Sequence, residues 1–100
     1  MPIPTTQEVK RSIGKVLQKY PSITKAYLFG SRARGTGKSY SDVDLALDGT
    51  ITIEVLLRVK GDLEEETALP FHFDVVSFPR VKQTLLGKKI TAEGKIIFQR

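Results

Sequence analysis

The segment that decides the fold runs from Ala26 to Leu47 and reads AYLFGSRARGTGKSYSDVDLAL. Its apolar start leads directly into Gly30-Ser31, as a strand leads into a phosphate-binding turn. Gly30 lets a phosphate approach the backbone closely, and Ser31 supplies a hydroxyl and an amide N–H. The segment therefore predicts a strand followed by a turn that can hold phosphate groups.

Two aspartates, Asp42 and Asp44, follow this turn. The alternation of side chains predicts a strand over residues 42–47, with both aspartates on one face and the apolar residues on the other. Carboxylates two residues apart lie about 7 Å apart along a strand. This spacing suits a pair of divalent cations about 3.5–4 Å apart. Hard carboxylate oxygens bind such ions well. Solvated carboxylates beside an edge strand are the plainer interpretation. Like charges on one face repel each other unless a cation lies between them, so a metal explains the pair better.

The neighbouring segment Gly35-Thr36-Gly37-Lys38-Ser39 has some similarity to the end of a Walker A loop. That loop needs a glycine five positions before Gly37, where this chain has Arg32, and it needs a helix afterwards. The pattern that follows is typical of a strand. A P-loop is therefore not expected.

Gly30-Ser31, ten intervening residues and Asp42-x-Asp44 together resemble the signature of the nucleotidyltransferase superfamily related to polymerase beta. The sequences GSRARG and SDVDL within this segment are most similar to the minimal nucleotidyltransferase (MNT) branch of that superfamily. The resemblance covers nearly the whole chain. It implies an α/β (α+β) polymerase-beta-like fold, with a small mixed sheet flanked by helices.

The rest of the sequence fits this fold within a single domain over residues 1–100. A capping box at Thr5–Glu8 begins a helix that ends by Pro21. Pro79 is expected to close the third strand, and Gly94 to end the last helix. The remaining predicted elements are strands at 23–29, 42–47, 71–76 and 95–99, a helical turn near Ala33, and helices at 51–67 and 81–93.

Asp74 is the candidate third acid, which a two-metal site needs to complete its ligands and to take the proton of the attacking hydroxyl. Phe73 and Val75 share one face of the predicted strand, so Asp74 points to the other. If the second and third strands are neighbours, its carboxylate reaches the side of Asp42 and Asp44. In the family that the chain resembles, an acid on this strand has that role. An exposed acid on an edge strand is the alternative.

The formal net charge of +5 has two interpretations, a nucleic-acid surface or contacts to nucleotide phosphates. Arg32, Arg34 and Lys38 lie between Gly30 and Asp42, where Arg32 and Arg34 could neutralise a triphosphate. No aromatic residues interleave with the positive ones as a single-strand binding platform requires. Nucleotide phosphates are therefore favoured over nucleic acid.

Composition restricts the other classes of protein. Cysteine is absent, which excludes disulfides and thiolate metal sites. No apolar run approaches the length of a membrane span, and the first residues lack the layout of a secretory signal. A cytoplasmic protein is the expectation.

The resemblance implies a Mg²⁺-dependent nucleotidyltransferase with two metal ions and ATP as substrate. Asp42, Asp44 and Asp74 would be catalytic and metal-binding, and Gly30, Ser31, Arg32 and Arg34 would bind the nucleotide. The partner would be a helical HEPN-type toxin that receives AMP on a tyrosine, which makes this chain an antitoxin. Two alternatives stay open: a non-catalytic subunit that neutralises its partner by binding, and a nucleic-acid-directed nucleotidyltransferase. A homo-oligomer is compatible with the sequence.

Overall fold

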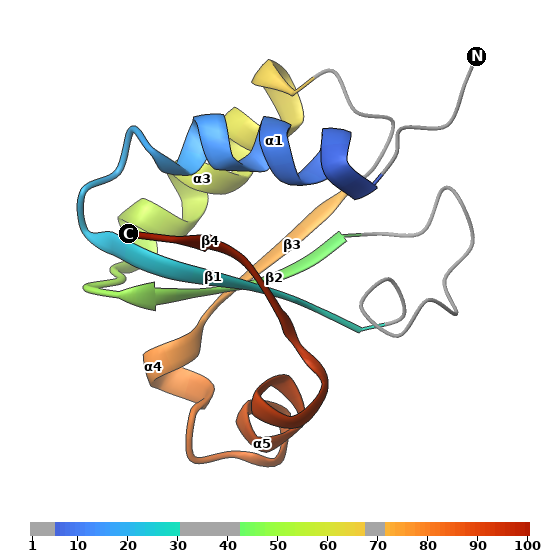
Figure 1. Cartoon of the computed structure of the whole chain (residues 1–100). Coiled ribbons are helices and arrows are strands. Elements are labelled where there is room, and N and C mark those ends of the chain that lie inside the picture. Colours follow the sequence, from blue (N-terminus) through green and yellow to red (C-terminus); the bar gives the residue numbers. More distant parts are fainter. Residues whose placement is uncertain (1–5, 31–42, 68–71) are drawn as a thin grey trace.

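The computed structural model describes residues 6–30, 43–67 and 72–100. Its centre is a four-stranded sheet in the order β3-β2-β1-β4 (Figure 1). β1 pairs antiparallel with both β2 and β4, whereas β2 and β3 are parallel. The strands are β1 (Ile23–Phe29), β2 (Val43–Gly49), β3 (Phe73–Ser77) and β4 (Lys95–Gln99). The predicted mixed sheet is confirmed.

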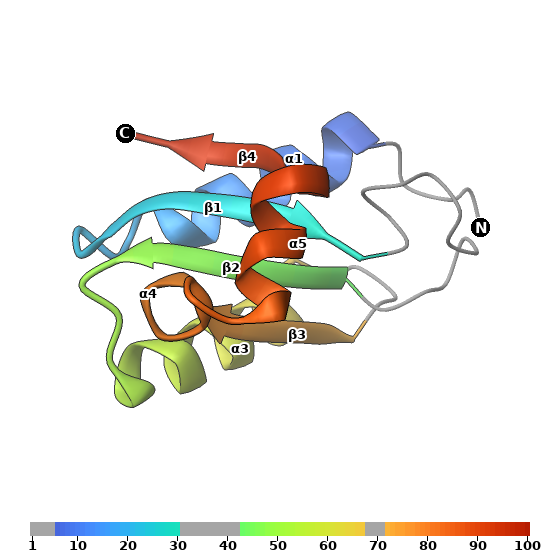
Figure 2. The ribbon, with the colours of Figure 1, turned by 90° about the horizontal axis from the view of Figure 1, so that it is seen from below.

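Helices cover both faces of this sheet. α1 (Thr6–Leu17) and α3 (Ile53–Glu66) lie on one face (Figure 1). The short α4 (Phe78–Val81) and α5 (Leu85–Glu93) lie on the other, where α5 crosses the strands (Figure 2). In the part of the chain that is described, no helix is long and apolar enough to cross a membrane.

The alternation of side chains along the strands divides the core into two clusters. The larger cluster joins α1 and α3 to one sheet face through side chains such as Ile13, Leu63, Leu45 and Phe73. The smaller one joins the other face to α4 and α5, with Ala46, Phe78 and Ile90 buried. The sequence predicts that the second strand faces a core with Val43, Leu45 and Leu47. All three are completely buried in the larger cluster.

The last predicted helix is wrong in one respect, because residues 81–93 do not form a single helix. Pro79 lies in the first turn of α4, where a missing N–H leaves no helical bond unmade. Thr84 then begins α5: its hydroxyl oxygen accepts a hydrogen bond from the Gly87 amide at 3.2 Å. A Cβ at Gly87 would lie 2.1 Å from the Val81 carbonyl oxygen, so only glycine allows α5 to start this close to α4. Gly94 ends α5 as expected.

Arg100 ties the last strand to the end of α1. Its guanidinium group donates hydrogen bonds to backbone carbonyl oxygens at distances of 2.7 to 3.3 Å. The acceptors are Leu17, Gln18, Tyr20 and Ile23. Three of these carbonyls lie at or just beyond the C-terminus of α1, where backbone acceptors have no partner within the helix.

Candidate functional site

Asp44 and Asp74 lie opposite each other on the neighbouring parallel strands β2 and β3. Adjacent strands are about 4.8 Å apart, which brings the two residues side by side. Both alternate with Ala46 and Val76 of the smaller core cluster, so they share the face that carries α4 and α5. Asp44 is half-buried and Asp74 is exposed. The expectation that the third strand neighbours the second, with Asp74 on the aspartate side, is confirmed.

Gly30 brings the end of β1 against the same carboxylate. Its φ of +79° is in the left-handed region that favours glycine. A Cβ at this position would lie 2.4 Å from Oδ2 of Asp44. The start of the predicted phosphate-binding turn therefore contacts the first of the paired carboxylates, with no room for a side chain between them.

The other expected site residues, Asp42, Ser31, Arg32 and Arg34, lie outside the described residues, and so do Lys38 and the predicted turn near Ala33. Their roles stay predictions. Within residues 6–30, 43–67 and 72–100, no group of three or more His, Cys, Asp or Glu side chains could hold a metal ion. The described part of the site contributes two carboxylates, those of Asp44 and Asp74. Carboxylate oxygens are donors that fit Mg²⁺.

A small hollow begins beside Gly30 and was not expected from the sequence. It has a volume of about 140 Å³ and lies between the end of β1 and α5. Its described lining residues are Phe29, Gly30, Leu86, Lys89 and Glu93. The helix itself was predicted, but the sequence carries no signal for how α5 crosses the sheet.

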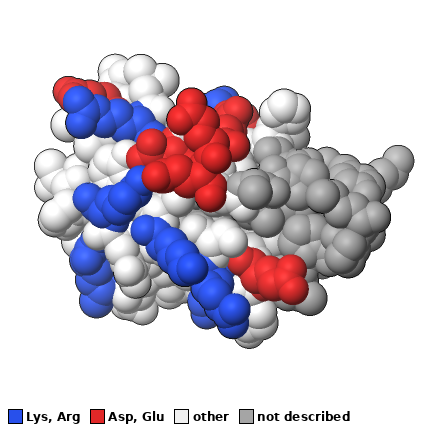
Figure 3. Space-filling model, turned by 90° about the horizontal axis from the view of Figure 1, so that it is seen from above, with Lys and Arg blue, Asp and Glu red and all other residues white. Residues whose placement is uncertain are grey.

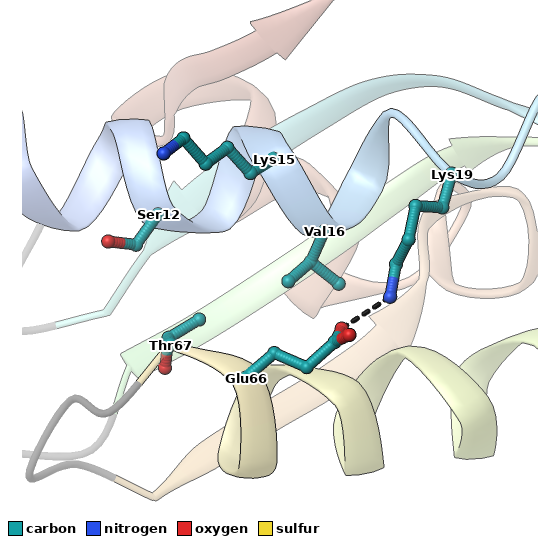
Figure 4. A pocket seen from close by; sticks show the side chains of 6 residues that line it. All are labelled: Ser12, Lys15, Val16, Lys19, Glu66 and Thr67. Carbon is teal, nitrogen blue, oxygen red and sulfur yellow. Dashed lines mark hydrogen bonds and ion pairs between the residues drawn. The ribbon is translucent and has the colours of Figure 1, made fainter.

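The opposite face of the sheet carries a separate polar cluster where the end of α1 meets α3. Lys19 forms an ion pair with Glu66 (Figure 4). It forms a second one, at 3.3 Å, with Asp62. The Tyr20 hydroxyl donates a hydrogen bond to Asp62, and this bond lowers the pKa of the Asp62 carboxyl. Burial, together with the same bond, raises the pKa of the Tyr20 phenol.

These contacts lie beside a hollow of about 290 Å³, lined by Ser12, Lys15, Val16, Lys19, Glu66 and Thr67. Seen from this side, acidic side chains gather in one patch and Lys and Arg side chains border it (Figure 3). The charged groups that line this hollow include a bonded pair, Lys19 and Glu66. The cluster therefore holds the turn after α1 against α3.

The chain is similar to known proteins in both sequence and fold. Residues 11–100 match the family described as polymerase beta, nucleotidyltransferase. The chain belongs to this nucleotidyltransferase family. No functionally curated protein sequence gives a significant match.

Solved structures of toxin–antitoxin pairs are similar to this nucleotidyltransferase. A toxin–antitoxin crystallised with AMP-PNP is 26% identical with a TM-score of 0.75, over 91% of this chain and 73% of that one. The MntA–HepT toxin–antitoxin is 23% identical with a TM-score of 0.70, over 95% and 74%. An MNT antitoxin complex with the tri-AMPylated HEPN toxin of Shewanella oneidensis is 19% identical with a TM-score of 0.67, over 96% and 74%. The polymerase-beta-like fold and the likeness to MNT antitoxins are thus confirmed.

Proposed function

We propose that this nucleotidyltransferase transfers AMP from ATP to a tyrosine hydroxyl of a HEPN-type partner and thereby acts as its antitoxin. The observation that carries the proposal is the pairing of Asp44 with Asp74 in register, with Gly30 against the Asp44 carboxylate. Family membership supports nucleotidyl transfer. The AMP-PNP complex and the AMPylated HEPN toxin among the similar structures support ATP and such a partner.

In this proposal each residue has a distinct task. Gly30 and Ser31 hold the β- and γ-phosphates through backbone N–H groups and the serine hydroxyl, with Arg32 and Arg34 neutralising their charge. Asp42, Asp44 and Asp74 would hold two Mg²⁺ ions, which when bound lower the pKa of the acceptor hydroxyl and neutralise the phosphates. The hydroxyl oxygen forms a bond to the α-phosphorus, the bond from that phosphorus to the β-phosphate bridging oxygen breaks, and pyrophosphate leaves. Asp74 takes the proton of the hydroxyl.

The exposure of Asp74 suits an acceptor that belongs to another protein. It lies on β3, the strand at one margin of the sheet, and is exposed to solvent. An incoming hydroxyl can therefore reach Asp74 from outside, whereas the half-buried Asp44 is shielded by Gly30. We infer that the partner supplies the surface that positions its own tyrosine.

The test is transfer from ATP labelled on the α-phosphate to the co-purified HEPN-type partner in the presence of Mg²⁺. We expect a mass increase of one AMP on a partner tyrosine, and we expect the double variant Asp42→Asn with Asp44→Asn to lose it. Glu64→Gln, an exposed acid of α3 on the opposite face, is the matched control and should transfer AMP normally. Undiminished transfer by the double variant would rule out this mechanism. An inactive double variant that still silences the partner would favour neutralisation by binding alone.

A further inference from the structure

We infer that the hollow between the end of β1 and α5 binds the adenine base of the nucleotide. The inference rests on the proposed function, because the nucleotide must lie with its α-phosphate near Asp44. Gly30 belongs to both places: it lines the hollow and it contacts the Asp44 carboxylate. A base in the hollow is thus attached to phosphates that reach the paired aspartates without crossing the sheet.

The walls of the hollow suit the faces of a flat ring. Phe29 is half-buried and packs against the smaller core cluster, which fixes one wall. Leu86 is 38% exposed although it is a large apolar side chain, so the surface it presents gains from being covered. The volume of about 140 Å³ is close to that of an apolar protein cavity that accepts an aromatic ring.

The two charged residues of the hollow suit the edge of the same ring. Adenine presents an amino group that donates hydrogen bonds beside a ring nitrogen that accepts them. Lys89 is a donor, and the Glu93 carboxylate, which already interacts with another group, has oxygens that accept. Both residues come from the turns of α5 that line the hollow. The hollow therefore combines apolar walls with one donor and one acceptor, as binding sites for cofactors and small ligands commonly do.

The partner's tyrosine is a less suitable occupant. The hollow is small and is closed on one side by α5, so a tyrosine could enter it only if its ring protruded far enough from the partner's surface. The base of a free nucleotide has no protein surface attached to it and can enter without that obstacle. The exposed Asp74 on β3 gives the acceptor a different approach.

The experiment compares ATP with inorganic tripolyphosphate, which has the phosphates and no base, by calorimetry in Mg²⁺ with the chain in complex with its partner. Leu86→Asn keeps the size of the side chain and replaces its apolar surface with a polar one, without adding charge. Leu57→Asn is the matched control, because Leu57 is 67% exposed on α3 across the sheet. We expect Leu86→Asn to weaken ATP binding about tenfold, with tripolyphosphate binding unchanged and Leu57→Asn like the wild type.

The results that would overturn the inference can be told apart. Unchanged ATP binding in Leu86→Asn, or equal weakening of ATP and tripolyphosphate binding, would show that the base does not bind in this hollow. Normal AMP transfer by the same variant would then leave the proposed function unaffected. Unchanged ATP binding with a raised KM for the partner protein assigns the hollow to the acceptor. A wild-type complex that binds neither ATP nor tripolyphosphate ends both the inference and the proposed function.

Discussion

Replacing Gly30 with alanine perturbs the contact between β1 and the Asp44 carboxylate at one atom. The new Cβ would lie 2.4 Å from Oδ2 of Asp44, while ordinary contacts of this kind begin at 3.4 Å. The carboxylate must therefore retreat by about 1 Å, and a displacement of that size in a catalytic site can reduce the rate about 100-fold. The left-handed φ of +79° adds a cost of about 1–2 kcal/mol in the free energy of unfolding. We expect a folded protein with about 1% of the transfer activity.

The assay measures the initial rate of AMP transfer to the partner, together with urea unfolding followed by circular dichroism. Gly49→Ala is the matched control, because Gly49 also has a positive φ, +124°, at the far end of β2. Its Cβ would lie 2.1 Å from the backbone carbonyl oxygen of Ser22, which cannot rotate away as a carboxylate can. Gly49→Ala should thus lose more stability than Gly30→Ala and keep the rate per folded molecule. A wild-type rate in Gly30→Ala, or an equal loss of rate in both variants, would refute the reasoning.

Three further predictions concern stability and are all measured by urea unfolding. Tyr20→Phe should lose about 1 kcal/mol, because it removes a partly buried hydrogen bond. Because the pKa of Asp62 is lowered, the stability lost in Tyr20→Phe should shrink as the pH falls below the ordinary carboxyl value of 3.8. Because the pKa of Tyr20 is raised, the same loss should shrink as the pH rises above the ordinary phenol value of 10.0. An equal loss of stability at pH 3 and pH 7 would contradict the contact. Gly61→Ala should gain about 0.5–1 kcal/mol, since a Cβ there meets no atom within 4 Å inside α3, and a loss would show that the helix needs glycine. Arg100→Ala should lose about 1.5–3 kcal/mol in the free energy of unfolding, because it removes the hydrogen bonds to backbone carbonyls. If Arg100→Ala loses no more than Arg100→Lys does, the several donors of the guanidinium group are unimportant.

The strands could be predicted from the sequence because alternation decides both the element and its faces. The expected range 23–29 matches β1 and 95–99 matches β4, while 42–47 ends two residues before β2 does. The same alternation placed Asp74 on the face of Asp44, because Phe73 and Val75 must point to the larger core cluster. What remained conditional was the pairing of β2 with β3, since strand order depends on how the crossover helix α3 packs.

The helices after β3 could not be predicted as well. The apolar spacing over 81–93 is compatible with one helix, and the break depends on a backbone contact between Gly87 and Val81 that exists only after α4 and α5 pack together. The hollow beside Gly30 depends on the same packing. Leu86, Lys89 and Glu93 belong to α5, whereas Phe29 and Gly30 precede them by more than fifty positions in the chain. Periodicity within one segment carries no information about such a meeting.

The paired aspartates are tested most directly by crystals of the complex grown with a non-hydrolysable ATP analogue and Mn²⁺, which takes the place of Mg²⁺ and is located by its anomalous scattering. We predict a Mn²⁺ peak within about 2.0–2.3 Å of carboxylate oxygens of both Asp44 and Asp74, with the analogue's phosphates against Gly30. A nucleotide bound with its Mn²⁺ on the α1–α3 face, or a peak that touches neither aspartate, would contradict the proposed site.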